Sequence, residues 1–332
     1  MKHVDLSRIT QILTYKRPHG STGVLDLIED IFAGYPWRVL KDPEDQDLAL
    51  VITVGNSKTL FSCHLDTVHC TPGEQVVMWD EEISLFYKEE VTALQFGEPL
   101  GADNGAGIWL LLNMIDADVP GTYLFHFGEE VGGVGSRGMA LHHSKFLGKF
   151  DRAIAFDRMS TGSVITHQAM GRCCSDEFGG ALADALNCAQ RSFTYRLDDG
   201  GKFTDTANYI DLIGECTNVS CGYDMEHTPN EILDMEHLTM LRQACIEIDW
   251  EALPTVRVPG EVYGAEMFNG WNTYRSDYPP LGNPMDDLMG AEYLEVENWV
   301  YDNIKDPESI TSVLWELLRT RDGDNHYWEQ HV

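Results

Sequence analysis

Five short segments of the chain are rich in side chains that can bind metal ions. They are residues 62–68 (SCHLDTV), 101–107 (GADNGAG), 128–132 (GEEVG), 155–158 (AFDR) and 226–231 (EHTPNE). Histidine nitrogens and carboxylate oxygens are usual ligands of catalytic zinc. Four of the five segments follow predicted strands, at the carboxyl ends where open α/β sheets place their active sites.

The spacing within the segments lets neighbouring side chains take different roles. His64 and Asp66 alternate at a strand end and point to the same side, so one can bind a metal while the other orients the imidazole. Asp103 lies in a glycine-rich turn, and its two carboxylate oxygens could bridge two ions. The adjacent acids Glu129 and Glu130 point in different directions, which suits one ligand and one base.

The complete set contains two histidines and three acids as ligands, with one glutamate left over. Asp157 closes the next strand, and His227 lies in a loop before the last long helix. If Asp103 is shared, each of two metals, about 3.5 Å apart, has three protein ligands and an open position for water. The metals would lower the pKa of that water, and the spare glutamate could pass its proton to a leaving amine.

Each segment also has a simpler explanation when it is taken alone. A His-x-Asp can be a surface accident, an aspartate in a glycine turn a plain turn residue, and a Glu-Glu pair a solvated edge. A histidine before Thr-Pro commonly belongs to a helix-capping loop. The order of the five segments and their position at strand ends favour a dinuclear site over five coincidences.

Hydrophobic periodicity predicts the elements that must position these segments. Helical spacing predicts two N-terminal helices, over 6–13 and 24–31. Short apolar runs predict strands over 48–54, 59–62, 76–78, 83–86, 121–127, 153–156 and 216–220. The later strands alternate with predicted helices over 106–114, 136–143, 176–190 and 235–250. This alternation predicts an α/β fold, a three-layer sandwich with a mixed, mostly parallel sheet covered on both faces.

The chain changes character after Pro254. Residues 254–285 are rich in Gly, Pro, Tyr and Asn, which predicts an extended, loop-rich segment. Two helical patterns follow, and the second begins at Asp306-Pro307 with an N-cap residue and a proline in the first turn. We therefore predict a catalytic domain over 1–253. Residues 254–332 are expected to form a loop-rich wrap and a two-helix appendage that packs back on this domain.

Composition restricts the partners of the chain. Its 332 residues include 54 acidic and 23 basic side chains, a formal net charge of −31. This charge repels phosphate backbones and anionic lipids, which argues against nucleic acid or membranes as partners. The N-terminus lacks the apolar stretch of a secretory signal, so we expect a cytoplasmic protein. The eight cysteines are then expected to be reduced and mostly buried.

The segments CHLDTV (63–68), LGADNGAG (100–107) and GEEVG (128–132) resemble the signature blocks of the co-catalytic zinc exopeptidases. That superfamily includes tripeptidases, aminoacyl-histidine dipeptidases, carboxypeptidase G-like enzymes and the bacterial leucyl aminopeptidases. The resemblance covers roughly residues 45–250. It implies the phosphorylase/hydrolase-like fold of these enzymes and two bound Zn²⁺ or other divalent ions.

The resemblance also implies a distribution of the ligands between the two metals. His64 and Asp157 would bind one zinc, and Glu130 and His227 would bind the other. Asp103 would bridge the two ions.

Two further roles and one backbone feature are implied by the same resemblance. Glu129 would be the general base, and Asp66 would orient the ring of His64. Members of the superfamily often have a cis peptide bond after the bridging aspartate, which here is Asp103–Asn104.

The spacing of the ligands departs from one branch of the superfamily. Dipeptidases and carboxypeptidases insert a lid or dimerisation domain between the fourth and fifth ligands, whereas Asp157 and His227 are only 227 − 157 = 70 residues apart. The layout is therefore closer to the lidless aminopeptidases, although the motifs resemble the other branch. Residues 200–209 resemble the Ser/Thr-Asp loop of lidless members and are expected to face the substrate.

The favoured function is a metal-dependent exopeptidase acting on peptides, more specifically an aminopeptidase. Two alternatives stay open: an amidohydrolase that deacylates N-acyl amino acids on the same fold, and a non-catalytic structural protein with a vestigial metal site. The intact base Glu129 argues against the second alternative. The sequence does not determine which substrate side chain the enzyme prefers, nor its oligomeric state. Candidates for contacting the substrate are Arg158, Arg172 and Asp205.

Overall fold

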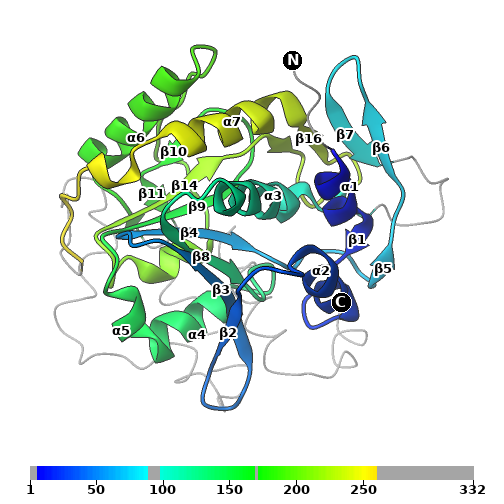
Figure 1. Ribbon diagram of the computed structural model, residues 1–332, viewed down its shortest axis with the longest axis horizontal. Coiled ribbons are helices and arrows are strands. Elements are labelled where there is room, and N and C mark those ends of the chain that lie inside the picture. Colours follow the sequence, from blue (N-terminus) through cyan, green and yellow to red (C-terminus); the bar gives the residue numbers. More distant parts are fainter. Residues whose placement is uncertain (1–5, 89–97, 169–170, 260–332) are drawn as a thin grey trace, which may run out of the picture. The chain divides into compact units, whose positions relative to one another are not determined.

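The computed structural model describes residues 6–88, 98–168 and 171–259, which are organised around a mixed eight-stranded sheet (Figure 1). The strand order is β13-β10-β14-β9-β4-β8-β3-β2. The strands span Arg38–Lys41 (β2), Asp47–Val54 (β3), Thr59–His64 (β4), Gly121–His126 (β8), Arg152–Arg158 (β9), Ser163–Ile165 (β10), Arg196–Asp198 (β13) and Glu215–Ser220 (β14). The four central strands, β14, β9, β4 and β8, are all parallel, which confirms the predicted mixed and mostly parallel sheet.

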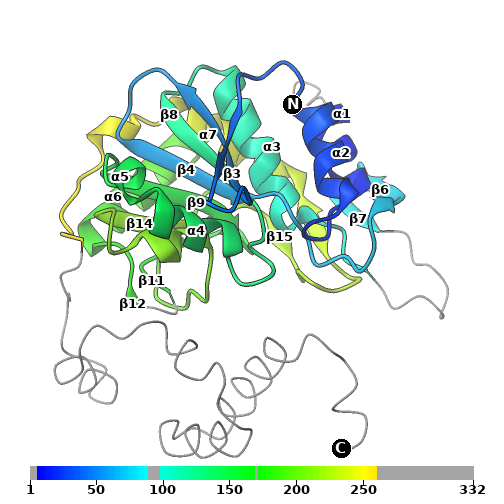
Figure 2. The ribbon, with the colours of Figure 1, turned by 90° about the horizontal axis from the view of Figure 1, so that it is seen from below.

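Helices cover both faces of this sheet, as Figures 1 and 2 show together. One face carries helices α1 (Ser7–Thr14), α2 (Thr22–Ile31), α3 (Ala102–Asp116), α6 (Asp176–Ala189) and α7 (Met235–Glu247). The other face carries α4 (Val134–His142), α5 (Ser144–Leu147) and the 3-10 turn η1 (Asp205–Tyr209). The predicted three-layer sandwich is therefore confirmed. Helix α7 ends earlier than predicted because Ile248 is extended, and a separate turn, η2 (Trp250–Ala252), follows.

The central strands are buried on both faces, and their side chains divide between two apolar cores. In β8, Tyr123 and Phe125 enter the core beneath α3, whereas Leu124 enters the core beneath α4. Successive strand residues point to opposite faces, so an unbroken apolar run fills both cores at once. Both faces of the central sheet are thus anchored, and the strand ends that carry the candidate ligands are held in fixed register.

Smaller sheets lie beside the main one. A four-stranded sheet has the order β15-β16-β7-β6, and its strands span Tyr223–Asp224 (β15), Ile232–Asp234 (β16), Leu85–Lys88 (β7) and Val77–Asp80 (β6). Two antiparallel pairs are formed by β1 (Tyr15–Lys16) with β5 (Gly73–Glu74), and by β11 (His167–Gln168) with β12 (Gly171–Arg172). The connection between β15 and β16 is the segment that contains His227.

The interval between Asp157 and His227 contributes to the main sheet. Its strands β10, β13 and β14 are members of that sheet, and η1 and α6 pack on it. The described residues of this interval form no separate domain, as the 70-residue spacing predicted.

The chain after Pro254 is described only as far as residue 259. Its first residues are anchored by the buried Arg257, which donates hydrogen bonds to the carbonyls of Ile210 and Gly214. The two helices predicted for the C-terminal appendage lie outside the described residues, so the proposed domain boundary stays a prediction.

The cysteines agree with the sequence-based expectation. All eight cysteines are free, and six of them are buried; Cys70 and Cys188 are exposed. Among the described residues, no helix is both long and apolar enough to cross a membrane.

A buried arginine ties the N-terminal segment to the loops that carry the candidate ligands. Arg17 is fully buried, and its guanidinium donates hydrogen bonds to the carbonyls of Leu65 at 2.8 Å, Ile12 at 2.8 Å, Tyr15 at 3.1 Å and Gly101 at 3.2 Å. Burial lowers its pKa to about 10, which still leaves it charged at neutral pH. Arg17 thus joins the segment after β4 to the turn before α3.

We expect Arg17→Met to lower the free energy of unfolding by at least about 3 kcal/mol, because several buried carbonyls lose a charged donor. Urea denaturation followed by circular dichroism measures this change. Arg38→Met removes an exposed arginine and is the matched control. Equal stability of the two variants would contradict a structural role for Arg17.

Candidate metal centre

Two candidate ligands come from adjacent parallel strands of the main sheet. His64 is the last residue of β4, and Asp157 is the penultimate residue of β9. Because β4 and β9 are parallel neighbours, their carboxyl ends lie at the same edge of the sheet. The third strand at this edge, β8, leads directly into Glu129 and Glu130, which follow it by three and four residues. The predicted use of strand ends is confirmed for these segments.

Asp103 reaches the same place from a helix rather than from a strand end of the main sheet. It lies in the first turn of α3, where Asp103 and Asn104 have non-helical backbone angles. The side-chain oxygen of Asn104 accepts a hydrogen bond from the Gly107 amide at 2.8 Å, so Asn104 caps the regular helix. A Cβ on Gly107 would lie 2.5 Å from the Phe156 carbonyl oxygen, so glycine lets α3 lie close against β9. The Asp103–Asn104 bond is cis, as predicted.

The candidate ligands form two groups around the carboxylate of Asp103. Its Oδ1 lies 3.0 Å from Nε2 of His64, and the same nitrogen lies 3.2 Å from Oδ1 of Asp157. Its Oδ2 lies 3.3 Å from Nε2 of His227, which is 3.0 Å from Oε2 of Glu130. Each oxygen of Asp103 thus contacts one histidine, and each of these histidines contacts one further acid, which is the partition that the resemblance implied.

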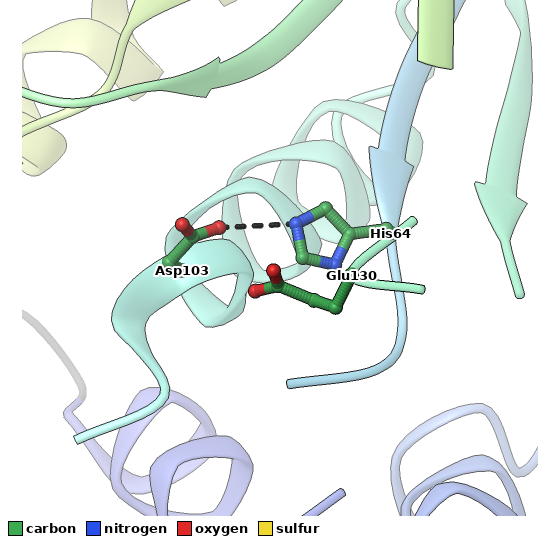
Figure 3. Close-up of side chains that lie close together, drawn as sticks. All are labelled: His64, Asp103 and Glu130. Carbon is green, nitrogen blue, oxygen red and sulfur yellow. Dashed lines mark hydrogen bonds and ion pairs between the residues drawn. The ribbon is translucent and has the colours of Figure 1, made fainter. Parts of the chain in front are cut away.

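Figure 3 shows three of these side chains, His64, Asp103 and Glu130, close together. Each offers a ligand atom, and these three atoms lie within 4.8 Å of one another. The carboxylates are mostly buried, with side-chain exposures of 10% for Asp103, 7% for Glu130 and 5% for Asp157. His227 is 48% exposed and lies at the rim.

The chemistry of these residues fits bound divalent metal ions. Four acids, Asp103, Glu129, Glu130 and Asp157, surround two imidazoles, and burying so many like charges is unfavourable unless cations compensate them. Oδ1 of Asp157 is buried, and apart from its 3.2 Å contact with Nε2 of His64 it has no hydrogen-bond partner within the described part of the chain. Imidazole nitrogens with carboxylate oxygens suit Zn²⁺ and similar ions. The two groups around Asp103 would each hold one ion.

Mutual proximity shifts the pKa values of these groups. Hydrogen bonds to Asp103 and Glu130 raise the pKa of His227 to about 11. Burial, together with the charge of Asp103, raises the pKa of Asp157 to about 7. Burial disfavours the charged form of His64, but the charge of Asp157 and hydrogen bonds to both aspartates outweigh it and raise its pKa well above the ordinary value. Protons thus act here as the counter-charges that metal ions can replace.

Glu129 differs from its neighbour Glu130 in having no ligand-like contact. Its side chain lies on the wall of a cavity next to the cluster. Among the described residues, none donates a hydrogen bond to its carboxylate. Burial, reinforced by the nearby charge of Asp157, raises its pKa well above the ordinary value. A free carboxylate of raised pKa beside the ligands is suited to accepting and returning a proton.

The Asp66 carboxylate binds the backbone amides of both glutamates, whereas the resemblance implied only a role in orienting His64. Its Oδ1 accepts hydrogen bonds from the amides of Gly128 at 2.9 Å and Glu129 at 3.1 Å, and its Oδ2 accepts one from Glu130 at 3.2 Å. The His64 ring donates instead to the main-chain carbonyl of Asp66, at 3.0 Å from Nδ1, while the carboxylate is 3.7 Å away. Asp66 therefore contacts the ring mainly through its backbone and fixes the loop of the two glutamates through its side chain.

The segment 204–218 supports Asp157. The hydroxyl of Thr204 donates a hydrogen bond to Oδ2 of Asp157 at 2.6 Å. The side chain of Asn218 bonds both the amide and the carbonyl of Asp157, at 2.9 and 2.7 Å. Such contacts orient a metal ligand and strengthen its binding.

We expect Thr204→Val to weaken binding of one of two zinc ions by about 10- to 100-fold, because the ligand Asp157 loses its orienting donor. Competition with a fluorescent zinc chelator measures both binding steps. Thr53→Val removes the hydroxyl of an exposed threonine of β3 that contacts Thr122 and is the control. Two unchanged affinities in the Thr204 variant would show that this hydrogen bond does not support a metal ligand.

Glu231 belongs to the site and was not assigned by the sequence analysis. Its carboxylate is buried and accepts hydrogen bonds from the amides of Gly101 and Asp103, both at 2.8 Å. Burial and the charge of Asp103 raise its pKa to about 7. The only signal in the sequence was its position four residues after His227, which does not reveal that it reaches across to the turn before α3. The sequence likewise does not reveal that Arg17 reaches the carbonyls of Leu65 and Gly101.

The cavity next to the ligands has a volume of about 150 Å³. Its wall includes the four acids and His227, followed by Arg158 and the loop residues Lys202 and Phe203. The structure therefore places Arg158 beside the candidate metal centre.

The other two candidates for substrate contact lie elsewhere. Asp205 is 1% exposed, and its Oδ2 lies 3.1 Å from Nδ1 of the buried His126, which also contacts the hydroxyl of Tyr209. Arg172 pairs with Asp176 at 2.7 Å. Neither Asp205 nor Arg172 lines the cavity. Asp205 thus helps to hold the loop 200–209 in place, while Lys202 and Phe203 of that loop face the cavity.

The fold is shared with solved structures of peptidases. Aminopeptidase PepT of Bacillus cereus aligns with a TM-score of 0.55 and 14% identity, over 73% of this chain and 96% of that one. A tripeptidase of Staphylococcus aureus aligns with a TM-score of 0.56 and 14% identity, over 73% and 95%. The TET1 peptidase of Pyrococcus horikoshii, which can assemble into a tetrahedron or a large octahedral shell, aligns with a TM-score of 0.50 and 13% identity, over 73% and 99%.

At these identities, the structural similarity establishes a common fold. No protein-family model matches the sequence, and no curated protein matches it.

Proposed function

We propose that this chain is a dinuclear zinc exopeptidase, and more specifically an aminopeptidase. The observation that carries the proposal is the position of Asp103, whose two oxygens each contact a different histidine, while each histidine also contacts one further acid. The free carboxylate of Glu129 beside this pair supplies the remaining group that hydrolysis needs. A fold shared with structures named as an aminopeptidase and a tripeptidase supports the same class of reaction.

The mechanism assigns separate tasks to the residues of the chain. Two divalent ions, when bound, would lower the pKa of a water molecule and stabilise negative charge on the carbonyl oxygen of the substrate. Glu129 takes a proton from the attacking water and passes it to the leaving amine. Asp66 holds the backbone of Glu129 and Glu130, so that base and ligand keep a fixed relation. Thr204 orients Asp157, and Glu231 holds the turn that carries Asp103.

Access to the site favours trimming of a chain end. His227 is 48% exposed and Lys202 is exposed, so the rim of the cavity lies at the surface. The described residues between Asp157 and His227 contribute no lid. A peptide whose remainder protrudes into solvent can therefore present its terminal residue to the cavity.

Digestion of a peptide library by the zinc-loaded chain, with mass analysis of the products, tests the proposal. We expect loss of one residue at a time from the N-terminus, no cleavage of N-acetylated peptides, and loss of activity with a chelator. Release of acyl groups from N-acyl amino acids would indicate a deacylase instead. Trimming from the C-terminus, or no cleavage of any substrate, would contradict the aminopeptidase assignment.

A further inference from the structure

Two cationic side chains that are not candidate metal ligands line the cavity beside the candidate metal centre. Arg158 follows the ligand Asp157 directly on β9, and Lys202 lies on the loop between β13 and η1. Both line the cavity. The chain carries 54 acidic and only 23 basic residues, so its overall field repels an anion. Local cations are therefore required wherever it binds one.

Arg158 retains donors that the described part of the chain does not satisfy. Its side chain is only 21% exposed, yet its guanidinium makes a single long hydrogen bond, 3.4 Å to the Gly200 carbonyl. Asp198 forms an ion pair with the guanidinium over 3.6 Å, too long for a hydrogen bond, and Nε is buried without a hydrogen-bond partner. A guanidinium has five N–H donors, and buried polar groups without partners are uncommon in folded proteins. The missing acceptors point to a ligand.

Lys202 adds a second charge that is free to move toward such a ligand. Its side chain is exposed, and within the described residues it forms no ion pair. The loop that carries Lys202 is anchored by two contacts. Thr204 donates a hydrogen bond to Asp157, and Asp205 lies against His126. A long flexible ammonium on an anchored loop can close over a bound anion.

The size and the remaining walls of the cavity indicate what the anion is attached to. A volume of about 150 Å³ is smaller than the roughly 300–1,000 Å³ of pockets for drug-sized ligands, so it suits one side chain. Met159, Ile165, Phe203 and Tyr223 supply apolar surface that can contact methylene groups. A short aliphatic chain ending in a carboxylate matches both properties.

We propose that Arg158 and Lys202 form an anion subsite that binds a carboxylate of the substrate, first of all the side chain of an acidic N-terminal residue. This inference rests on the proposed peptidase function, because it places the scissile bond at the metal centre. Guanidinium and carboxylate pair through charge-assisted hydrogen bonds, which are stronger than neutral ones. The C-terminal carboxylate of a very short peptide is the other source of the same chemistry.

The test compares substrates that differ only in this charge, using the full zinc-loaded chain. Glutamyl and glutaminyl p-nitroanilide have the same shape, and trialanine and its C-terminal amide separate the second source. We expect kcat/KM to be at least about tenfold higher for the glutamyl compound than for the glutaminyl one, and similar for trialanine and its amide. A preference for free trialanine alone would move the subsite to the C-terminal carboxylate. No preference within either pair would overturn the proposal.

Variants locate the effect. Arg158→Gln and, independently, Lys202→Met should each reduce the ratio of kcat/KM for the glutamyl compound to kcat/KM for the glutaminyl one. Lys145→Met removes an exposed charge of α5 outside the cavity and should retain the full ratio. A preference that survives both subsite variants would contradict the assignment of these residues.

Calorimetry with free L-glutamate and L-glutamine separates failure of the inference from failure of the proposed function. Tighter binding of glutamate that is lost in Arg158→Gln supports the subsite even in a chain that cleaves nothing. Cleavage of the glutaminyl compound without any preference or binding difference leaves the peptidase function intact and rejects the subsite.

Discussion

Glu129→Gln is expected to lower kcat at least about 100-fold while fold and metal content stay unchanged. Glutamine keeps the shape of the side chain and removes its ability to take a proton. The structure supports this separation of effects, because the Glu129 carboxylate lines the cavity and makes no ligand-like contact. Steady-state kinetics, with zinc content measured on the same samples, provides the readout.

Glu29→Gln is the control for this experiment, since it removes an exposed acid of α2 in the same way. Near wild-type turnover in Glu129→Gln would reject the general-base role. Loss of zinc from that variant would instead place Glu129 among the ligands.

Asp103→Asn is expected to have the second large effect, on metal binding and activity together. An amide offers a single neutral oxygen ligand and cannot replace a carboxylate that faces two ligand groups at 3.0 and 3.3 Å. We expect the wild-type chain to bind two zinc ions and the variant to lose at least one of them. The affinity should fall by more than the roughly 10- to 100-fold that follows loss of an outer-shell contact.

Metal analysis after equilibrium dialysis, together with activity, measures this outcome. Asp26→Asn, an exposed acid of α2, is the control. Full zinc content and near wild-type activity in Asp103→Asn would refute the bridging role. A wild-type chain that binds only one ion would refute the dinuclear centre itself.

Asp66 shows why the role of a supporting residue could be misread from the sequence. The alternation of His64 and Asp66 on a strand end correctly suggested that the two are neighbours. The carboxylate, however, accepts hydrogen bonds from three consecutive amides of the loop after β8. That loop is more than 60 residues away along the chain, and only the pairing of β4 with β8 brings it within reach.

Asp205 illustrates a similar limit. Its loop was expected to face the substrate, and Lys202 and Phe203 do line the cavity. Asp205 itself, the first residue of the turn η1, points inward to the buried His126. Adjacent residues of a loop can point in opposite directions, and periodicity gives no guide to orientation where the backbone is irregular.

The sequence by itself determined the order of the elements, the α/β class and the identity of the side chains able to bind metals. These properties follow from local periodicity and from motifs a few residues long. The tertiary structure decided which of those side chains meet: it placed Asp103 at a helix start between two histidines 163 residues apart (227 − 64). It also revealed Arg17 and Glu231, whose partners are main-chain groups. Main-chain groups are identical at nearly every position, so no sequence pattern distinguishes the ones that a folded chain brings to a buried charge.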